Sequence, residues 1–469
     1  GIYNSCNYMY RYALVNFDAI VANAEPQGNM IYAGVAKTLK VYLFSMMVDL
    51  WGDLPYSEFN IPGLTAPNAD SSKDIYNALI VLLDDAKADL EDTEAANLTV
   101  PGTDDLIYGG DEAKWIRLNN TIKLKLLLQS RKAKSDVVDC QAKFDALIAA
   151  DNFIDEGEDF QFWYNATTNP TDERHPAYID EYAGGQVTYY VSPFFYEVMK
   201  GETLNVTDNP FGGIVDPRIP YYFFNQLKGN DSQNPHEYRN GNFMSIFFAS
   251  AGPNSAHAND GSTTKIGIYP CGGKYDDGNG GTISKFEQGN GAAPHKMITY
   301  AALKFMLAEL ALTGETTADA KVLFTDAMKA AIDHVNTVAS KQEGVPVIAN
   351  TTRDNFVNTI VAKYDAANNA GKLRILMTQK WIHNFFNPID SYTDYRRTGY
   401  PTLFDPSKTQ NPGFGVNPTV TAKSAAAVPL ENIASFPRSL YYPTTSETNL
   451  NPNVSQKVNL STPFVFWDK

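Results

Sequence analysis

Two adjacent aromatic residues followed by an amide form the pattern best suited to ligand recognition in this sequence. Trp163, Tyr164 and Asn165 lie between an acidic stretch and a turn-rich stretch. Because successive side chains of an extended chain point to opposite sides, at least one ring is expected to face outward. Aromatic rings stack on sugars or peptides, and an amide is both donor and acceptor. We therefore predict a ligand-binding surface here; the alternative is that Trp163 anchors this region to the helices.

The surrounding region, residues 151–294, carries further aromatic side chains among many glycines, prolines and asparagines. Helical periodicity fails in this region, and Gly and Pro pairs mark turns. Loops of this length are commonly functional or disordered, and the density of aromatic residues favours order. The predicted ligand surface is therefore extended to three more tyrosines: Tyr189, Tyr190 and Tyr275.

Oxygen-bearing side chains are concentrated in the Gly-rich turn that follows Tyr275. Asp276, Asp277 and Asn279 offer the hard oxygen ligands that calcium prefers. Their spacing is not that of an EF-hand, and the terminal glutamate of that loop is absent. An ordinary Asx turn explains the same composition. Calcium at these three residues is therefore one of two interpretations, and no other cofactor is expected.

Sequence motifs of catalysis are missing. There is no Gly-x-Ser-x-Gly elbow and no phosphate-binding Gly-Lys motif, and His236-Glu237 lacks the second histidine of a zinc motif. Asp53 and Glu58 are a conceivable carboxylate pair for glycoside hydrolysis. A turn that ends a helix already explains Asp53. The residues therefore favour a binding protein over an enzyme.

The composition limits the possible partners. Among 469 residues, 38 are basic and 53 acidic, which gives a net charge of −15. Nucleic acids need a basic footprint, and anionic lipid attracts cations, so neither is an expected partner. Aromatic residues make up 12% of the chain, which suits stacking on sugar or peptide. The three cysteines are too few and too far apart for a disulfide framework or a zinc site.

Helices must position these residues. Ser71 and Asp74 form a capping box, and apolar residues then recur at helical spacing as far as Leu90. Trp381 falls on a helical stripe with Leu376 and is expected in a core. The other predicted helices cover residues 113–134, 144–150, 299–312, 318–338 and 373–386. The sequence therefore predicts a mostly α protein with a loop-rich lobe that contains short strands.

Five motifs, in the same order along the chain, resemble the SusD-like (SusD/RagB) outer-membrane nutrient-binding lipoproteins of Bacteroidota. They are Gly-Asp-Leu-Pro-Tyr at 52–56, the segment 105–111, Gln-Lys-Trp-Ile at 379–382, Tyr-Arg-Arg-Thr-Gly-Tyr-Pro at 395–401, and Pro-Arg-Ser-Leu-Tyr-Tyr-Pro at 437–443. The similarity is greatest to the branch with Arg-Arg-Thr-Gly-Tyr-Pro and a C-terminal tryptophan, here Trp467. Arg396 and Arg397 are accordingly interpreted as structural residues and not as ligand contacts.

The resemblance implies a single SusD-like domain over residues 1–469. Its tetratricopeptide-like helical scaffold would comprise residues 1–150 and 295–400, and its loop-rich lobe residues 151–294 and 401–469. It also implies a non-catalytic protein that captures a glycan oligomer and delivers it to a TonB-dependent, SusC-like barrel. The expected location is the outer face of the outer membrane, with a lipid-bearing cysteine upstream of Gly1. A peptide ligand, a glycoside hydrolase and a purely structural surface protein are the alternatives.

Overall fold

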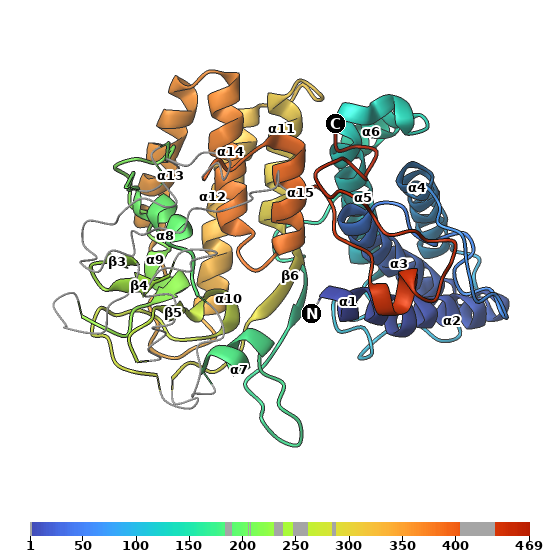
Figure 1. Cartoon of the computed structure of the whole chain (residues 1–469), viewed down its shortest axis with the longest axis horizontal. Helices are drawn as coiled ribbons and strands as arrows, with labels where there is room; N and C mark the ends of the chain where they lie inside the picture. Colours follow the sequence, from blue (N-terminus) through green and yellow to red (C-terminus); the bar gives the residue numbers. More distant parts are fainter. Residues whose placement is uncertain are drawn as a thin grey trace. The chain divides into compact units, whose positions relative to one another are not determined.

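A computed structural model shows a mostly helical protein (Figure 1). It describes residues 2–182, 190–204, 206, 208–228, 238–246, 261–283, 288–403 and 437–469. The chain divides into two compact units. Unit 1 contains Gly1–Phe160, Ile389–Thr398 and Ala434–Lys469, and unit 2 contains Gln161–Pro388 and Gly399–Ile433.

Unit 1 is built from consecutive helices that pack on one another in chain order. Its elements are α1 (Ile2–Tyr8), the π-helix η1 (Met9–Leu14), α2 (Val15–Ala24), the 3-10 turn η2 (Glu25–Gln27), α3 (Met30–Trp51), α4 (Ser72–Leu90), α5 (Glu112–Gln129), the 3-10 segment η3 (Ser130–Asp136), α6 (Cys140–Ala150), most of α15 (Pro388–Thr398) and the π-helix η5 (Thr444–Thr448). Helix α3 is long and apolar enough to cross a membrane, but most of it is buried within the protein, as in a core helix.

Side-chain caps set the starts of two of these helices. The Ser71 Oγ atom accepts a hydrogen bond of 3.1 Å from the backbone N–H of Asp74, which confirms Ser71 as the predicted N-cap, and the Ser71 hydroxyl donates to the Asp74 carboxylate at 2.6 Å. At α5 the Asp111 carboxylate accepts from the N–H of Lys114 at 3.1 Å. Each cap satisfies a backbone donor that the first helical turn leaves without a partner.

The Gly-Asp-Leu-Pro motif after α3 joins three parts of unit 1. Gly52 has φ +77°, and a Cβ atom there would lie 2.3 Å from the carbonyl oxygen of Phe464, so only glycine fits. The Asp53 carboxylate accepts from the N–H of Ser72 at 2.6 Å, and its carbonyl accepts from the Tyr442 hydroxyl at 2.6 Å. The motif therefore fixes the end of α3, the start of α4 and the C-terminal segment 437–469 together.

A buried polar cluster holds the C-terminal segment against α3. The Asp49 carboxylate accepts hydrogen bonds from the Tyr76 hydroxyl and, at 3.2 Å, from the Trp467 indole N–H. The Arg396 guanidinium lies 4.7 Å from the centre of the Trp467 ring and donates to the Asp49 carbonyl and, at 2.9 Å, to the Arg438 carbonyl. The interpretation of Arg396 as a structural residue is thereby confirmed.

Unit 2 combines four longer helices with short strands and helical turns. Its elements are β1 (Phe160–Trp163, of which Phe160 belongs to unit 1), α7 (Pro176–Tyr182), α8 (Pro193–Lys200), α9 (Ile219–Tyr222), β2 (Phe223–Phe224), β3 (Tyr238–Asn240), β4 (Phe243–Ser245), β5 (Lys265–Ile266), α10 (Ile268–Cys271), β6 (Pro294–Ile298), α11 (Tyr300–Leu312), α12 (Ala320–Ala339), α13 (Asn350–Ala366) and α14 (Asn369–His383). The strands pair as β1 with β6, β2 with β5 and β3 with β4. In Figure 1 the four longer helices, α11 to α14, stand side by side.

The core of unit 2 joins these helices to the loop-rich region through aromatic rings. Phe195 of α8 stacks on Phe385 with ring centres 4.7 Å apart and meets Trp381 of α14 edge-on at 4.8 Å. Trp381 is partly buried against this core, as its helical stripe predicts. The aromatic residues of the loop-rich region are therefore in large part core residues.

The helices that were not predicted from the sequence include α13, α15, the continuous stretch α1–η1–α2, and the short helices α7 to α10 in the region expected to be loop-rich. The predicted helix over 113–134 continues as α-helix only to Gln129, and 3-10 structure follows. The mostly α class and the tetratricopeptide-like helical scaffold are confirmed.

Substitution of Asp49 tests the buried cluster through pH. Burial raises the pKa of Asp49 to about 6, above its ordinary value of 3.8. The Asp49 carboxylate therefore binds a proton at a higher pH in the folded protein than in the unfolded chain. As pH rises from about 4 to about 6, the stability of the wild type relative to Asp49→Asn should fall by about 1–3 kcal/mol and then level off.

Urea unfolding of both proteins at each pH measures this difference. Asp326→Asn, on an exposed position of α12, is the control for the loss of one carboxylate. A wild-type advantage that stays constant or grows over this pH range would contradict the assignment.

Substitution of Trp381 tests the core of unit 2. Trp381→Ala removes a partly buried ring from Phe195 and should lower the free energy of unfolding by about 2–4 kcal/mol. Trp381→Phe keeps an aromatic ring there and should cost less. Thermal and urea unfolding measure both, and an unchanged Tm for the alanine variant would show that the ring does not stabilise the core.

Candidate functional site

The first candidate surface surrounds Trp163, at the end of β1. The Trp163 ring is half-buried, and one side of it packs against the core of unit 2. The Lys341 ammonium lies 5.0 Å from the ring centre, and the Lys341 carbonyl accepts a hydrogen bond from the Asn290 amide at 3.0 Å. The packing of Trp163 supports the anchoring interpretation, and ligand contact at the accessible part of the ring stays a prediction.

Tyr164 and Asn165 continue this surface. The Tyr164 ring is half-buried between Phe162, at 5.0 Å, and His175, at 5.1 Å. Burial lowers the pKa of His175 to about 4, so this imidazole is neutral at physiological pH. Asn165 is exposed, but its amide donates to the Glu173 carboxylate at 2.5 Å and its oxygen accepts from the Thr167 N–H at 2.7 Å. The Asn165 side chain therefore shapes a turn, which leaves it little capacity for a ligand.

The other three tyrosines of the predicted ligand surface, Tyr189, Tyr190 and Tyr275, have different environments or lie outside the described residues. Tyr189 lies outside the described residues, and Tyr190 is half-buried. Tyr275 packs against the core of unit 2, with its ring 4.9 Å from that of Tyr221. Among the described residues, no ring contact joins Tyr275 to Trp163 or Tyr164. These tyrosines remain predicted, not demonstrated, members of one ligand surface.

The oxygen-rich turn is held together by its own hydrogen bonds. The Asp276 carboxylate accepts from the Asn225 amide at 2.6 Å and from the Gly278 N–H at 2.9 Å. The Asp277 carboxylate accepts from both the backbone and the side chain of Asn279 at 3.0 Å. No group of three or more His, Cys, Asp or Glu residues within the described ranges is arranged to hold a metal. Asx turns account for these contacts, and calcium here stays a prediction.

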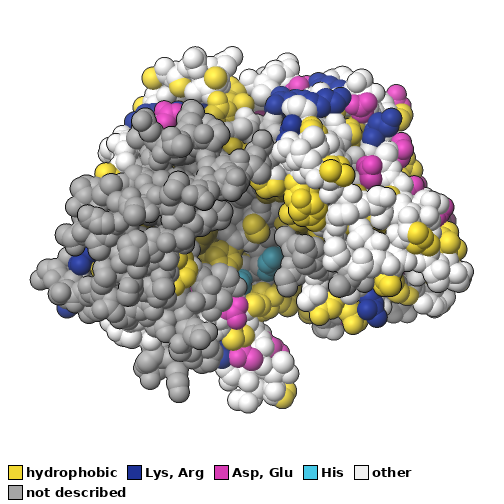
Figure 2. Space-filling model, in the orientation of Figure 1, with side chains coloured by type: hydrophobic (Ala, Val, Ile, Leu, Met, Phe, Trp, Pro, Cys, Tyr) yellow, Lys and Arg dark blue, Asp and Glu magenta, His cyan; other side chains and the backbone are white. Residues whose placement is uncertain are grey.

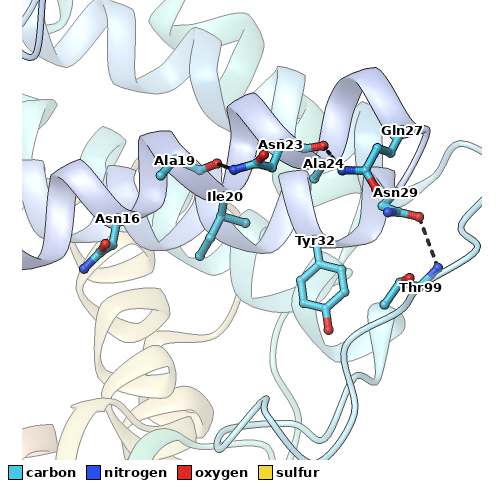
Figure 3. Close-up of a pocket in the computed structure, with 9 residues that line it drawn as sticks. All are labelled: Asn16, Ala19, Ile20, Asn23, Ala24, Gln27, Asn29, Tyr32 and Thr99. Carbon is cyan, nitrogen blue, oxygen red and sulfur yellow. Dashed lines mark hydrogen bonds between the residues drawn. The ribbon is translucent and has the colours of Figure 1, made fainter.

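The second candidate surface is a groove in unit 1 of about 490 Å³ (Figure 3). It lies between α2, the start of α3 and the loop around Thr99. We name it the amide groove after its lining, which is Asn16, Ala19, Ile20, Asn23, Ala24, Gln27, Asn29, Tyr32 and Thr99. Figure 3 shows Ile20 and Tyr32 projecting to the same side from neighbouring helices.

Backbone hydrogen bonds hold the amides of this groove in place. The Asn23 amide donates to the Ala19 carbonyl at 2.8 Å, and the Gln27 amide donates to the Asn23 carbonyl at 2.9 Å. The Asn29 oxygen accepts from the Thr99 N–H at 3.1 Å, which ties the loop to the start of α3. The groove is thus lined by neutral polar groups of fixed orientation, the kind of lining that recognises a neutral polar ligand.

This groove was not predicted from the sequence. Its lining residues on α2 and η2 follow a helical period, with Asn16, Ile20, Asn23 and Gln27 on one face. That spacing was a usable signal, because exposed amides at such intervals form a polar stripe. The contributions of Tyr32 and Thr99 depend on tertiary structure and had no such signal.

Asp53 and Glu58 do not form a catalytic pair. The Asp53 carboxylate caps α4, whereas both oxygens of the exposed Glu58 carboxylate accept from Asn68, the shortest contact being 2.7 Å to its N–H. The hydrogen bonds from Asn68 lower the pKa of Glu58, the opposite of what a general acid needs. The hydrolase alternative therefore loses the carboxylate pair on which it was based.

Comparison with known proteins identifies the family. The family model SusD-like_2, described as starch-binding and associating with the outer membrane, matches residues 3–418. The chain therefore belongs to the SusD-like family, whose members are non-catalytic carbohydrate-binding proteins. No curated protein sequence matches the chain.

Solved structures show the same fold at low sequence identity. A SusD homologue from Bacteroides fragilis NCTC 9343 has a TM-score of 0.69 at 19% identity, covering 97% of this chain and 88% of its own. A SusD/RagB family protein from Bacteroides thetaiotaomicron VPI-5482 has a TM-score of 0.64 at 19% identity, covering 99% and 87%. A chitin-binding SusD homologue from Flavobacterium johnsoniae has a TM-score of 0.62 at 20% identity, covering 99% and 86%.

Substitution of Trp163 separates its two roles. Trp163→Ala should lower the free energy of unfolding by about 1–2 kcal/mol, because the half-buried ring packs on the core. If the ring also contacts ligand, the folded variant should bind glycan about 5- to 100-fold more weakly. Calorimetric titration below the Tm, with Lys341→Ala as a control that leaves the ring in place, measures binding. Unchanged affinity would assign Trp163 to the core alone.

Proposed function

We propose that this protein captures a glycan oligomer at the outer membrane and passes it to a TonB-dependent, SusC-like transporter. The family assignment supports the outer-membrane association and a binding role without catalysis. The observation that carries the choice of ligand is the amide groove, in which neutral amides stand beside a tyrosine and an isoleucine. Hydroxyl groups of sugars pair with amides, and the apolar faces of sugar rings pack on aromatic side chains.

The ligand chemistry of the relatives points the same way. The family is described as starch-binding, and structural relatives include chitin-binding proteins. Both ligands are polymers of sugars without acidic groups. We also propose a separate glycan-binding surface within unit 2 at Trp163 and Tyr164, with Asn165, Tyr189, Tyr190 and Tyr275 as its predicted members.

A peptide is the second candidate ligand. Amides pair with a peptide backbone as readily as with hydroxyls, and tyrosine is common in peptide-binding surfaces. The groove alone therefore permits both ligands, and the family description favours the glycan. Direct titration with soluble glycans and with a peptide library distinguishes the two.

The proposal includes a lipid anchor and an exposed position on the outer face of the outer membrane. A protein that hands its ligand to a transporter must remain at the membrane, and lipidation together with a partner gives stable attachment. The net charge of −15 disfavours electrostatic attachment to anionic lipid as the means of retention.

Isolation from native membranes tests the partnership. The tagged protein, solubilised in mild detergent, should recover a large outer-membrane barrel in near-stoichiometric amount. A tagged, unrelated outer-membrane lipoprotein from the same cells is the control for unspecific recovery. Repeated isolation of the protein without a barrel would argue against delivery to a transporter, whereas glycan binding would remain a separate question.

A further inference from the structure

The polar side chains of the amide groove form a row along one helical face. Asn16, Asn23 and Gln27 recur at intervals of seven and four residues, so they stand on the same side of the α2–η2 helix. At a rise of 1.5 Å per residue, the row is about 16 Å long. A row of this length contacts several units of an oligomer and is longer than a single sugar requires.

Each amide in this row is oriented before a ligand arrives. The Asn16 amide donates to the Tyr12 carbonyl at 2.5 Å, and Asn23 and Gln27 make the equivalent bonds to the carbonyls four residues before them. One N–H of each amide is used in this way. The three side-chain oxygens accept no hydrogen bond from the described part of the chain. A neutral donor and a neutral acceptor thus remain at each position.

Apolar contacts accompany the polar row. Ile20 and Tyr32 project into the groove from α2 and α3. One and two turns before Asn16, the exposed rings of Tyr12 and Tyr8 lie 5.5 Å apart. Because α1, η1 and α2 form one continuous helix, the two rings extend the row beyond the groove. Apolar side chains beside amides match the two surfaces of a sugar, which are its C–H faces and its hydroxyl edges.

The electrostatics of the groove oppose a negatively charged ligand. None of its lining residues carries a charge. The nearby Lys37 is paired with Glu25 at 2.7 Å and with Asp89 at 2.6 Å, and Lys40 is paired with Asp18. Arg11, beside Tyr12, lies outside the lining. In the face shown in Figure 2, basic side chains of unit 1 likewise lie beside acidic ones.

An acidic group stands at the edge of the groove. The Tyr32 hydroxyl donates to the Asp104 carboxylate at 2.7 Å, and this hydrogen bond lowers the pKa of Asp104. Asp104 is therefore ionised at neutral pH. A uronic acid or sulfate bound here would meet a like charge with no cation in the lining to compensate it.

We infer that the amide groove binds an uncharged oligosaccharide, extends its contact to Tyr12 and Tyr8, and discriminates against acidic glycans. This inference rests on the proposed function and adds the extension of the site to Tyr12 and Tyr8 and the charge class of the ligand. The free amide oxygens and N–H groups bond sugar hydroxyls, while Ile20 and Tyr32 pack against the rings.

Calorimetric titration of the full chain with two sets of oligosaccharides tests the inference. The neutral set contains malto-, cello- and chito-oligosaccharides, and the acidic set contains oligogalacturonate and sulfated chondroitin oligosaccharides. At least one neutral oligosaccharide should bind, and acidic ones should bind at least about tenfold more weakly.

Variants assign the binding to the groove. Asn23→Ala and Tyr12→Ala should each weaken binding of the neutral oligosaccharide by about five- to tenfold. Asn358→Ala, which removes an exposed amide from α13 in unit 2, is the matched control and should leave affinity unchanged. Asn23→Lys should bind acidic oligosaccharides more tightly than the wild type does. Melting curves of all variants confirm that each is folded.

The outcomes separate the inference from the proposed function. If the wild type binds a neutral glycan and the groove variants bind it equally well, the groove is not the site, although glycan capture stands. If the wild type prefers acidic oligosaccharides, the charge class is wrong. If it binds no glycan in either set and binds peptides instead, the proposed function itself fails.

Discussion

Unit 1 depends on the buried carboxylate of Asp49, because that group brings parts of the chain separated by about four hundred residues to one point. Tyr76 of α4 and Trp467 near the C-terminus both donate to it, so α3, α4 and the C-terminal segment meet at a single side chain. Arg396 of α15 adds a fourth element by donating to the carbonyl of the same residue. The cluster fixes the C-terminal end of α3, the helix whose N-terminal end contributes Tyr32 to the amide groove.

Burial disfavours the charged form of the Asp49 carboxyl group, so this group needs well-placed partners. Desolvation raises the pKa of Asp49, while the hydrogen bonds from Tyr76 and Trp467 and the charges of Lys125 and Arg396 act in the opposite direction. Burial also opposes the charged form of Lys457 in the C-terminal segment. Burial lowers the pKa of Lys457 to about 7, although its ammonium donates to the carbonyls of Trp51 and Leu440 at 2.5 and 2.7 Å. Removal of one partner leaves such a buried charge uncompensated, which strongly destabilises the fold.

Helices whose sequences contain a capping residue and a regular apolar period were predicted from the sequence. The capping box at Ser71 and the apolar period that follows it were sufficient for α4, and Thr299 caps α11 where the sequence predicts a helix start. Helix α13 was missed because its sequence, Asn350–Ala366, is rich in Thr, Asn and Val, which have low helix propensity. Its stability comes from packing of Phe356 and Ile360 in the core of unit 2, which no local pattern reveals.

The candidate sites were predicted less completely, for a related reason. Aromatic density led to the prediction of a ligand surface at Trp163, but this ring is half-buried in the structure and the Asn165 side chain is used in a turn. Composition cannot distinguish an aromatic residue that packs in a core from one that faces a ligand. The amide groove was not predicted because single exposed amides are common on protein surfaces. They form a groove only where the fold brings Thr99 and Tyr32 close to them.

The orientation of the groove amides by the helix backbone has a kinetic consequence. A side chain that is already fixed loses little conformational entropy on binding, so association needs no slow rearrangement. The same groups are open to water, which competes for each hydrogen bond and shortens the lifetime of the complex. At micromolar affinity and an association rate constant of about 10⁶ M⁻¹ s⁻¹, a bound oligosaccharide leaves within about one second. Such a brief residence is compatible with the proposed transfer of the ligand to a transporter.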